Sequence, residues 1–195
     1  MTQDGRDRSP PAPLATGETL IEAAQHTASG ASTVPQTLDA LRLRSAFGLF
    51  PTGVAVVTAR GSDGARLGMT INSLSSLSLD PALLTWNIAR RSRNHEVFTR
   101  ARHFAIHVLG QDQAALCKAF VMTDQDRFGQ IATTDSVEGV PLIPGCLARF
   151  ECRTHQLVEG GDHTLVVGQV LRIAEQPGQP LVFFRGQLGQ LAPRD

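Results

Sequence analysis

The sequence predicts a mainly β fold, a largely antiparallel barrel or sandwich with a few inserted helices. Predicted strands outnumber predicted helices, and the strands come in pairs joined by short turns rich in Gly, Asp and Ser, which is typical of hairpins. The regular alternation of strand and helix that marks a doubly wound parallel sheet is missing. A chain of 195 residues, 42% hydrophobic and 18% charged, is long enough for one compact domain with an extension.

Residues 1–36 are predicted to form a flexible N-terminal tail, and residues 37–195 the folded domain. The tail holds four prolines among Gly, Ser, Thr and Ala, and its only apolar patch is Leu20 with Ile21. Such a stretch buries too little surface to offset its chain entropy. From Thr37, a residue suited to N-capping, apolar residues recur at helical spacing. This pattern predicts an amphipathic helix of about a dozen residues that ends at Pro51.

The remaining elements are predicted from β-branched runs, turn residues and helical periodicity. Gly61-Ser62-Asp63-Gly64 and Gly160-Gly161-Asp162 have the composition of hairpin turns. The expected strands are 54–59, 67–79, 82–89, 104–109, 147–158, 164–173 and 181–184, and the expected helices cover about 94–102 and 113–122.

Charge and cysteine usage exclude several classes of function. Lys and Arg balance Asp and Glu, 18 against 18, and no basic run exceeds two residues, so neither nucleic acid nor a membrane surface is expected as a partner. No signal peptide and no apolar run of membrane-spanning length is apparent. The cysteines are odd in number, lack CxxC spacing and have no nearby histidine at a metal-ligand interval. We therefore expect packing thiols, no metal site and a cytoplasmic location.

Several catalytic motifs are absent from the sequence, namely GxGxxG, GxxxxGK[ST], GxSxG and HExxH. Their absence disfavours a Rossmann dehydrogenase, a P-loop enzyme, an α/β-hydrolase and a zincin. The six histidines show no pairing that suggests a catalytic triad, and no nucleophile with its base can be identified for acyl transfer.

The first positive signal is Arg90-Arg91-Ser92-Arg93-Asn94, at the predicted junction of a strand and a helix. Ser92 is a good N-cap, the helix start offers free backbone N–H groups, and guanidinium groups surround it. Together these features indicate a site for a single phosphate. The alternative is a capped helix whose arginines are solvated.

The second and third signals are polar residues in a predicted strand and a histidine beside a turn. Residues 68–78, GMTINSLSSLS, carry hydroxyl and amide side chains where packing alone would favour apolar ones, which indicates a polar ligand. The alternative for this strand is a barrel strand with one solvent face lined by Ser and Thr. Asp162 can cap the Gly160-Gly161 turn, and His163 enters the next strand. The alternative for the turn is an ordinary surface aspartate and histidine.

Together with residues 47–58, FGLFPTGVAVVT, these segments make the chain resemble the short flavin reductases that serve two-component flavin monooxygenases. The resemblance runs from about Leu41 to Leu191 and includes 68–73, 76–81, 104–109, 161–165 and 168–170, with Gln113 and Phe120. It implies an FMN-binding split barrel of Greek-key topology that works as a homodimer. It also implies hydride transfer from NADH or NADPH to FMN or FAD, and release of the reduced flavin to a separate monooxygenase.

By position, the resemblance makes His163 the catalytic residue, at the place that approaches the nicotinamide, with Gly161 and Asp162 shaping its turn. The residues that would line the flavin are Thr70, Ile71, Asn72, Ser73, Leu74, Ser76 and Leu77, and those on its phosphate side are Arg91, Ser92 and Arg93. The chain departs from the family where it has His107 in place of Asn, Leu74 in place of Phe, and Leu188 in place of an aromatic residue.

Two other functions stay open at this point. One is a protein of the same fold that stores or carries FMN without reducing it. The other is an enzyme whose bound flavin oxidises a small substrate directly, although a phosphate-ester substrate would need a second basic cluster, which the sequence lacks. The choices between FMN and FAD and between NADH and NADPH, and the partner oxygenase, also stay open.

Overall fold

A computed structural model describes residues 39–121 and 127–192; the predicted tail, Thr37 and Met122 lie outside the described residues. The helices are α2 (Ala40–Phe47), α3 (His95–Arg100) and α4 (Ala114–Val121), with a 3-10 turn at Arg127–Gly129. The strands are β1 (Thr52–Gly53), β2 (Ala55–Arg60), β3 (Arg66–Ile71), β4 (Ser75–Leu79), β5 (Ala82–Ala89), β6 (His103–Val108), β7 (Thr134–Asp135), β8 (Pro141–Leu142), β9 (Ala148–Gly160), β10 (His163–Glu175), β11 (Val182–Phe184) and β12 (Gln187–Gly189). Within the described ranges, no helix is long and apolar enough to cross a membrane.

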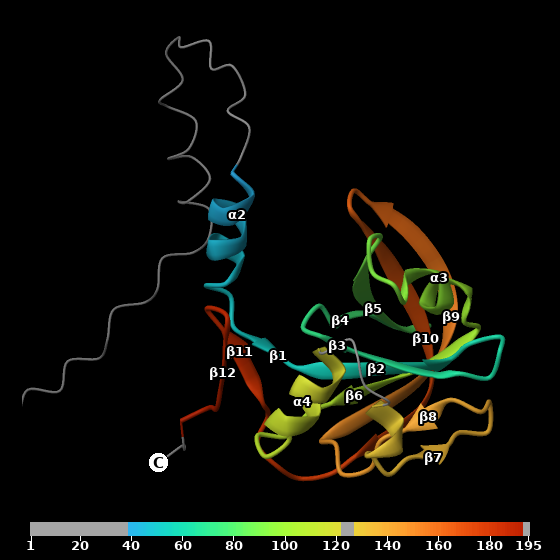
Figure 1. Cartoon of the computed structure of the whole chain (residues 1–195). Helices are drawn as coiled ribbons and strands as arrows, with labels where there is room; N and C mark the ends of the chain where they lie inside the picture. Colours follow the sequence, from blue (N-terminus) through green and yellow to red (C-terminus); the bar gives the residue numbers. More distant parts are fainter. Residues whose placement is uncertain (1–38, 122–126, 193–195) are drawn as a thin grey trace, which may run out of the picture. The chain divides into compact units, whose positions relative to one another are not determined.

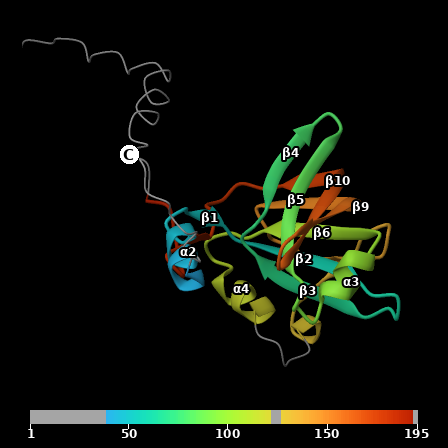
Figure 2. The same cartoon turned by 90° about the horizontal axis from the view of Figure 1, so that it is seen from above.

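Seven strands form one sheet in the order β3-β2-β6-β9-β10-β5-β4, so β3 and β4 are its two edges. Every neighbouring pair in this sheet is antiparallel. Strands β1, β11 and β12 form a small sheet, and β7 pairs with β8. The large sheet curves, and the β4–β5 hairpin rises away from β2 and β3 (Figures 1 and 2). The predicted mainly β, antiparallel fold with a few helices is confirmed.

The single strand predicted over residues 67–79 is wrong, because the chain divides it into β3 and β4 at residues 72–74. β3 pairs with β2, whereas β4 pairs with β5. The chain therefore passes within three residues from one edge of the sheet to the other. Among the described strands no ladder joins β3 to β4, so this closure of the sheet lacks a row of main-chain hydrogen bonds.

The first helix is shorter than predicted and does not face the core. Its N-cap is Asp39, whose carboxylate accepts a hydrogen bond from the Leu41 N–H at 3.0 Å. It ends at Gly48 rather than Pro51, where the Gly48 N–H donates to the Arg44 carbonyl at 3.0 Å. None of its residues is buried. Its apolar pattern therefore has no partner among the described residues.

The longest strands, β9 and β10, form a hairpin whose turn is the predicted Gly160-Gly161-Asp162. Gly161 has φ +68°, a left-handed conformation that glycine adopts without steric cost. On its other side, β10 pairs with β5, which places His163 opposite Ala89 and Leu165 opposite Asn87. This register brings the turn beside the chain that leads into α3.

Two clusters of buried apolar side chains lie on opposite faces of β2. The inner cluster is centred on Trp86, whose ring meets the rings of Phe98 and Phe104 edge-on at 5.4 and 5.8 Å between centroids. The outer cluster packs α4 onto the sheet. Phe120 of α4 lies so close to Gly68 that a Cβ atom there would stand 2.3 Å from its ring. Glycine at position 68 therefore allows the close approach of α4 to β3.

All three cysteines, Cys117, Cys146 and Cys152, are buried and unpaired with one another. Burial raises the pKa of each thiol, that of Cys152 to about 12. The thiols are therefore protonated at neutral pH, as expected for packing residues.

His107 is a fully buried link between three segments. Its Nδ1 lies 3.1 Å from the Val56 carbonyl oxygen, and its Nε2 accepts the Ile143 N–H at 3.0 Å. Nδ1 is therefore the protonated nitrogen of a neutral ring. Burial lowers the pKa of His107 to about 4, because the charged form would lose its hydration.

We expect His107 to make the protein less stable as the pH falls from 6.5 to about 4. In this window the unfolded chain binds a proton that the folded protein excludes, so the loss begins at the unfolded pKa and is complete near the folded one. The free energy of unfolding of the wild type should fall by about 3 kcal/mol more than that of His107→Asn across this range.

Urea denaturation at a series of pH values measures this difference, because carboxyl groups titrate alike in both proteins. His155→Asn, at an exposed position on β9, is the control and should follow the wild type. Parallel pH profiles for the wild type and His107→Asn would refute the assignment.

Candidate functional site

A cavity of about 620 Å³ lies where the edge of β3 faces β5 and β10. We call it the barrel-edge cavity. It collects residues from four separate segments of the chain: the end of β3 with the residues that follow it, the end of β5, the segment before α3, and the β9–β10 hairpin from Gly160 to Leu165. The residues that line it are Met69, Thr70, Ile71, Asn72, Ser73, Asn87, Ala89, Ser92, Gly160, His163 and Leu165.

Ser73, just after the end of β3, links this strand to β5 through hydrogen bonds. Its hydroxyl accepts the Asn87 N–H at 3.0 Å and lies 3.5 Å from the Asn87 carbonyl oxygen. The Thr70 side chain faces α4 instead, where its hydroxyl donates to the Cys117 carbonyl at 2.8 Å. Part of the polarity of this strand is therefore structural. The exposed Asn72 amide, between them, is the group best placed to meet a ligand.

The segment before α3 is arranged differently from the sequence-based prediction. Ser92 is not the N-cap, because α3 begins at His95 with Asn94 before it. The Ser92 hydroxyl instead accepts the Asn94 N–H at 3.3 Å, and the Ser92 carbonyl accepts the His95 N–H at 3.0 Å. A helix of six residues also has a weak dipole. Attraction for an anion here therefore depends on the exposed Arg91 and Arg93 rather than on the helix.

His163 also lines the barrel-edge cavity, and its ring is held by the neighbouring residue. Its Nδ1 lies 2.7 Å from the Asp162 carboxylate oxygen Oδ1. The hydrogen bond from His163, helped by the positive charges of His163 and Arg91, lowers the pKa of Asp162 below its usual range. Asp162 is therefore a carboxylate at neutral pH, which can only accept a hydrogen bond.

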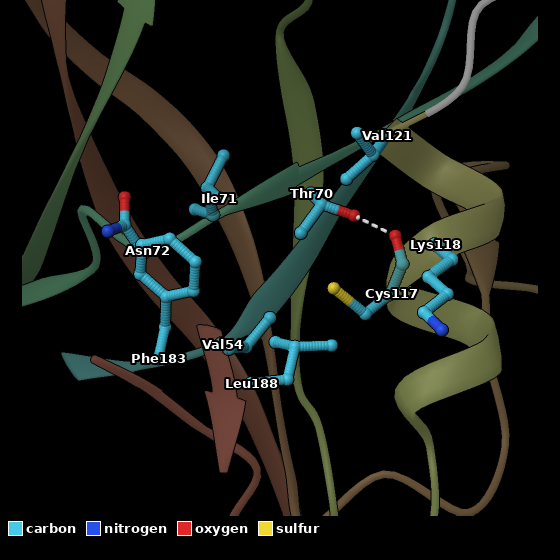
Figure 3. A pocket seen from close by; sticks show the side chains of 9 residues that line it. All are labelled: Val54, Thr70, Ile71, Asn72, Cys117, Lys118, Val121, Phe183 and Leu188. Carbon is cyan, nitrogen blue, oxygen red and sulfur yellow. Dashed lines mark hydrogen bonds between the residues drawn. The ribbon is translucent and has the colours of Figure 1, made fainter. Parts of the chain in front are cut away.

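A second hollow, which we call the α4 cavity, lies on the other side of the β3 end and measures about 410 Å³. Figure 3 shows that it is enclosed by β3, α4 and the β11–β12 hairpin, with the Thr70–Cys117 hydrogen bond at its wall. Apart from Lys118, Asn72 and Thr70, its lining is apolar: Val54, Ile71, Cys117, Val121, Phe183 and Leu188. Residues 70–72 thus separate two cavities.

The structure brings together some of the predicted site residues and separates others. Thr70, Ile71, Asn72, Ser73, Ser92 and His163 line one cavity. Leu74 instead packs against the inner cluster around Trp86. Ser76 and Leu77 lie exposed on β4, and Arg91, Arg93, Gly161 and Asp162 are exposed beside the residues that line the cavity.

Several lining residues were missed by sequence reasoning. Asn87, Ala89 and Leu165 reach the cavity only through the β5–β10 register, and Met69 only because β3 is an edge strand. Met69 and Leu165 lie within the matching segments 68–73 and 161–165, but their apolar side chains did not single them out, and none of the matching segments includes Asn87 or Ala89. The α4 cavity was also not predicted, because it needs α4 and β11 to be placed against β3.

Residues 47–192 match the family described as the flavin reductase like domain. The FMN reductase (NADH) SmoA of Agrobacterium fabrum is 46% identical over 159 residues, which cover 82% of this chain and 90% of that protein. The reductase component of the flavin-dependent trigonelline monooxygenase of Acinetobacter baylyi is 44% identical over 144 residues, 74% of this chain. These residues span only 46% of that longer relative.

Solved structures agree with these similarities. The NADH:FAD oxidoreductase SgcE6 of Streptomyces globisporus, in complex with NAD and FAD fragments, superposes with a TM-score of 0.75 at 38% identity. The superposition covers 80% of this chain and 94% of that one. The flavin reductase PheA2 superposes with a TM-score of 0.74 at 34% identity, covering 80% of this chain and 100% of that one.

Proposed function

The chain belongs to the flavin reductase like domain family, and from this premise we propose that it reduces FMN or FAD with NADH or NADPH and supplies the reduced flavin to a partner monooxygenase. The observation that carries the proposal is the barrel-edge cavity. It places the polar end of β3, Ser92 and His163 around one space. No nucleophile is needed at such a site, because the two cofactors supply the electronic chemistry.

The named relatives support this activity. The Agrobacterium protein is an FMN reductase that uses NADH, and the Streptomyces protein an NADH:FAD oxidoreductase. These names favour NADH as the donor, and they leave FMN and FAD both available to the present chain. The Acinetobacter relative and the reductase component of a nitrophenol monooxygenase from Rhodococcus opacus are parts of two-component oxygenases. A carrier that binds flavin without reducing it has no support from these relatives.

The cavity fits a flavin in size and in chemistry. Its volume, about 620 Å³, lies within the range usual for small-molecule sites. Asn72 can donate to and accept from the polar edge of an isoalloxazine ring, while Ile71, Met69 and Leu165 offer apolar surface. We propose that Thr70, Ile71, Asn72 and Ser73 bind this ring. Leu74, Ser76 and Leu77 would then support it from the core and from β4.

The reaction is hydride transfer from nicotinamide C4 to flavin N5, which the cofactors carry out once their rings are stacked. The protein has to hold the rings together and to balance the charge that the reduced ring gains. We propose that His163 approaches the nicotinamide and binds its carboxamide, and that Gly161 and Asp162 shape the turn that carries it. His163 and residues 70–73 line the same cavity, which allows them to meet the same ligands.

The phosphate of the flavin would lie at Arg91, Ser92 and Arg93. The two exposed guanidinium groups flank Ser92, which lines the cavity. Arginine binds phosphate with paired N–H donors and keeps its charge at any physiological pH. The proposed anion site therefore borders the same cavity, through Ser92.

We also propose that the protein is a homodimer. Helix α2 buries none of its residues, and Phe47 and Phe50 are 71% and 74% exposed. On the edge strand β4, Leu77 and Leu79 are exposed as well. Exposed apolar side chains in this number are typical of surfaces that a partner covers. A second copy of the chain is the proposed partner. The cytoplasmic location expected from the cysteines stays a prediction.

The activity is tested by following the absorbance of NADH or NADPH at 340 nm with FMN or FAD in excess. We expect oxidation with at least one of the four combinations. In His163→Ala, kcat/KM for the nicotinamide should fall at least tenfold, while the dissociation constant of the flavin changes less than threefold, because ring binding depends on residues 70–73. His155→Ala on β9 is the matched histidine control.

If no combination turns over, the proposed activity is wrong. If the wild type binds flavin without any nicotinamide-dependent rate, the protein is a carrier.

The phosphate site is tested by comparing FMN with riboflavin, which differs only in lacking the phosphate. Wild-type protein should bind FMN at least tenfold more tightly, since charge-assisted hydrogen bonds each contribute about 1.5–3 kcal/mol. In the double variant Arg91→Gln/Arg93→Gln the two flavins should bind alike in fluorescence titrations. Arg100→Gln, which removes an exposed arginine paired with Glu96, should keep the preference for FMN. An unchanged preference in the double variant would place the phosphate elsewhere.

The homodimer is tested by light scattering after size exclusion. The wild type should run at twice the chain mass of 20.9 kDa. Phe47→Ser/Phe50→Ser should shift it toward the monomer, because stable interfaces need roughly 800 Å² of well-packed surface from each partner. Val137→Ser, which removes a valine that is 90% exposed far along the chain, should leave the mass unchanged. A monomeric wild type would contradict the proposal.

A further inference from the structure

The hydrogen bond between Asp162 and His163 determines which nitrogen of the histidine ring carries the proton, in addition to shaping the turn. Asp162 Oδ1 and His163 Nδ1 lie 2.7 Å apart, a short hydrogen bond for such a pair. Because the carboxylate can only accept, Nδ1 must carry the proton, whatever the charge of the ring. In the neutral ring, Nε2 is then left as an acceptor. This is the opposite of the Nε2–H form that neutral histidine favours in water.

Asp162 is itself anchored to the residue that follows β5. Its backbone carbonyl accepts the Arg90 N–H at 2.9 Å, and Arg90 also forms an ion pair with Glu159 at 2.9 Å. One residue thus joins the tip of the β9–β10 hairpin to the segment that leads to Ser92. Its side chain faces His163, while its main chain is bound to the end of β5. The ring is therefore held relative to the proposed phosphate site and not only relative to its own strand.

His163 lines the barrel-edge cavity, so its remaining nitrogen is a polar atom available there. An acceptor nitrogen selects a ligand that offers an N–H group. The carboxamide of nicotinamide carries such an NH₂ group, whereas the reacting ring atoms carry none.

Resting on the proposed function, we propose that Asp162 is a positioning residue. It locks the neutral ring of His163 in the Nδ1–H form, so that Nε2 accepts a hydrogen bond from the carboxamide NH₂ of the nicotinamide. Asp162 need not touch either cofactor. Its effect passes through the imidazole and disappears when the imidazole is removed.

The first test is the ¹⁵N spectrum of histidine-labelled protein, free of ligands, at a pH where titration shows His163 to be neutral. The His163 signals, assigned by their loss in His163→Ala, should be those of the Nδ1–H form in the wild type. In Asp162→Ala they should shift to the Nε2–H form. Asp162→Asn, which keeps an oxygen acceptor, should retain the Nδ1–H form at least in part. A wild type in the Nε2–H form would overturn the proposal.

The second test is a double-mutant cycle on the steady-state kinetics with NADH and flavin. Asp162→Ala should raise KM for NADH about tenfold, the worth of one well-aligned hydrogen bond, with a smaller change in kcat. Asp162→Ala/His163→Ala should match His163→Ala alone. Asp63→Ala removes the turn aspartate of the β2–β3 hairpin, which caps the Ala65 N–H at 3.0 Å, and should leave KM unchanged.

If the effects of the two substitutions on KM for NADH add in full, Asp162 acts independently of His163 and the proposal is wrong. A wild type that oxidises no nicotinamide would refute the proposed activity instead. The spectra would then still decide whether Asp162 sets the form of the ring.

Discussion

The architecture depends on the passage of the chain from β3 to β4. Within residues 72–74 it leaves one edge of the seven-stranded sheet and joins the other, so that the curved sheet closes without a ladder between its edges. The Ser73 hydroxyl, bound to the Asn87 N–H, holds the two sides together. Because side chains bridge this gap in place of a ladder, a cavity remains there, and Asn72, Ser73, Ser92 and His163 line it.

Much of the fold could be predicted from the sequence, because local patterns agreed with the final pairing. The strand expected over 82–89 has those bounds, and both hairpin turns lie where Gly and Asp placed them. The predicted elements differ from the structure where the local sequence pattern was ambiguous. Residues 67–79 show no change of periodicity at the point where the chain changes edges. The first helix was expected to end at Pro51 but ends at Gly48, and its amphipathic spacing does not say which surface covers the apolar side.

The candidate site was partly predictable for the same reason. Asn72, Ser73, Ser92 and His163 stood out as polar residues at strand and turn positions, and the structure places them around one cavity. Asn87 and Leu165 come into the site only by their cross-strand register, which no local pattern encodes. The polarity of the β3 segment also had two causes that a sequence cannot separate. Thr70 and Ser73 bind main-chain groups of neighbouring elements, whereas Asn72 is exposed and lines the cavity.

The absence of a hydrogen-bond ladder between β3 and β4 affects how fast a ligand can bind and dissociate. A flavin bound as proposed would lie beside the free edge of β3, and it could arrive and depart while every main-chain hydrogen bond of the sheet stays intact. Its residence time would then be governed by a few side-chain contacts and by the proposed contacts with Arg91 and Arg93, so salt should shorten it. For an enzyme whose product is transferred to another protein, fast exchange of this kind is an advantage, because slow dissociation of a tightly bound flavin would slow that transfer.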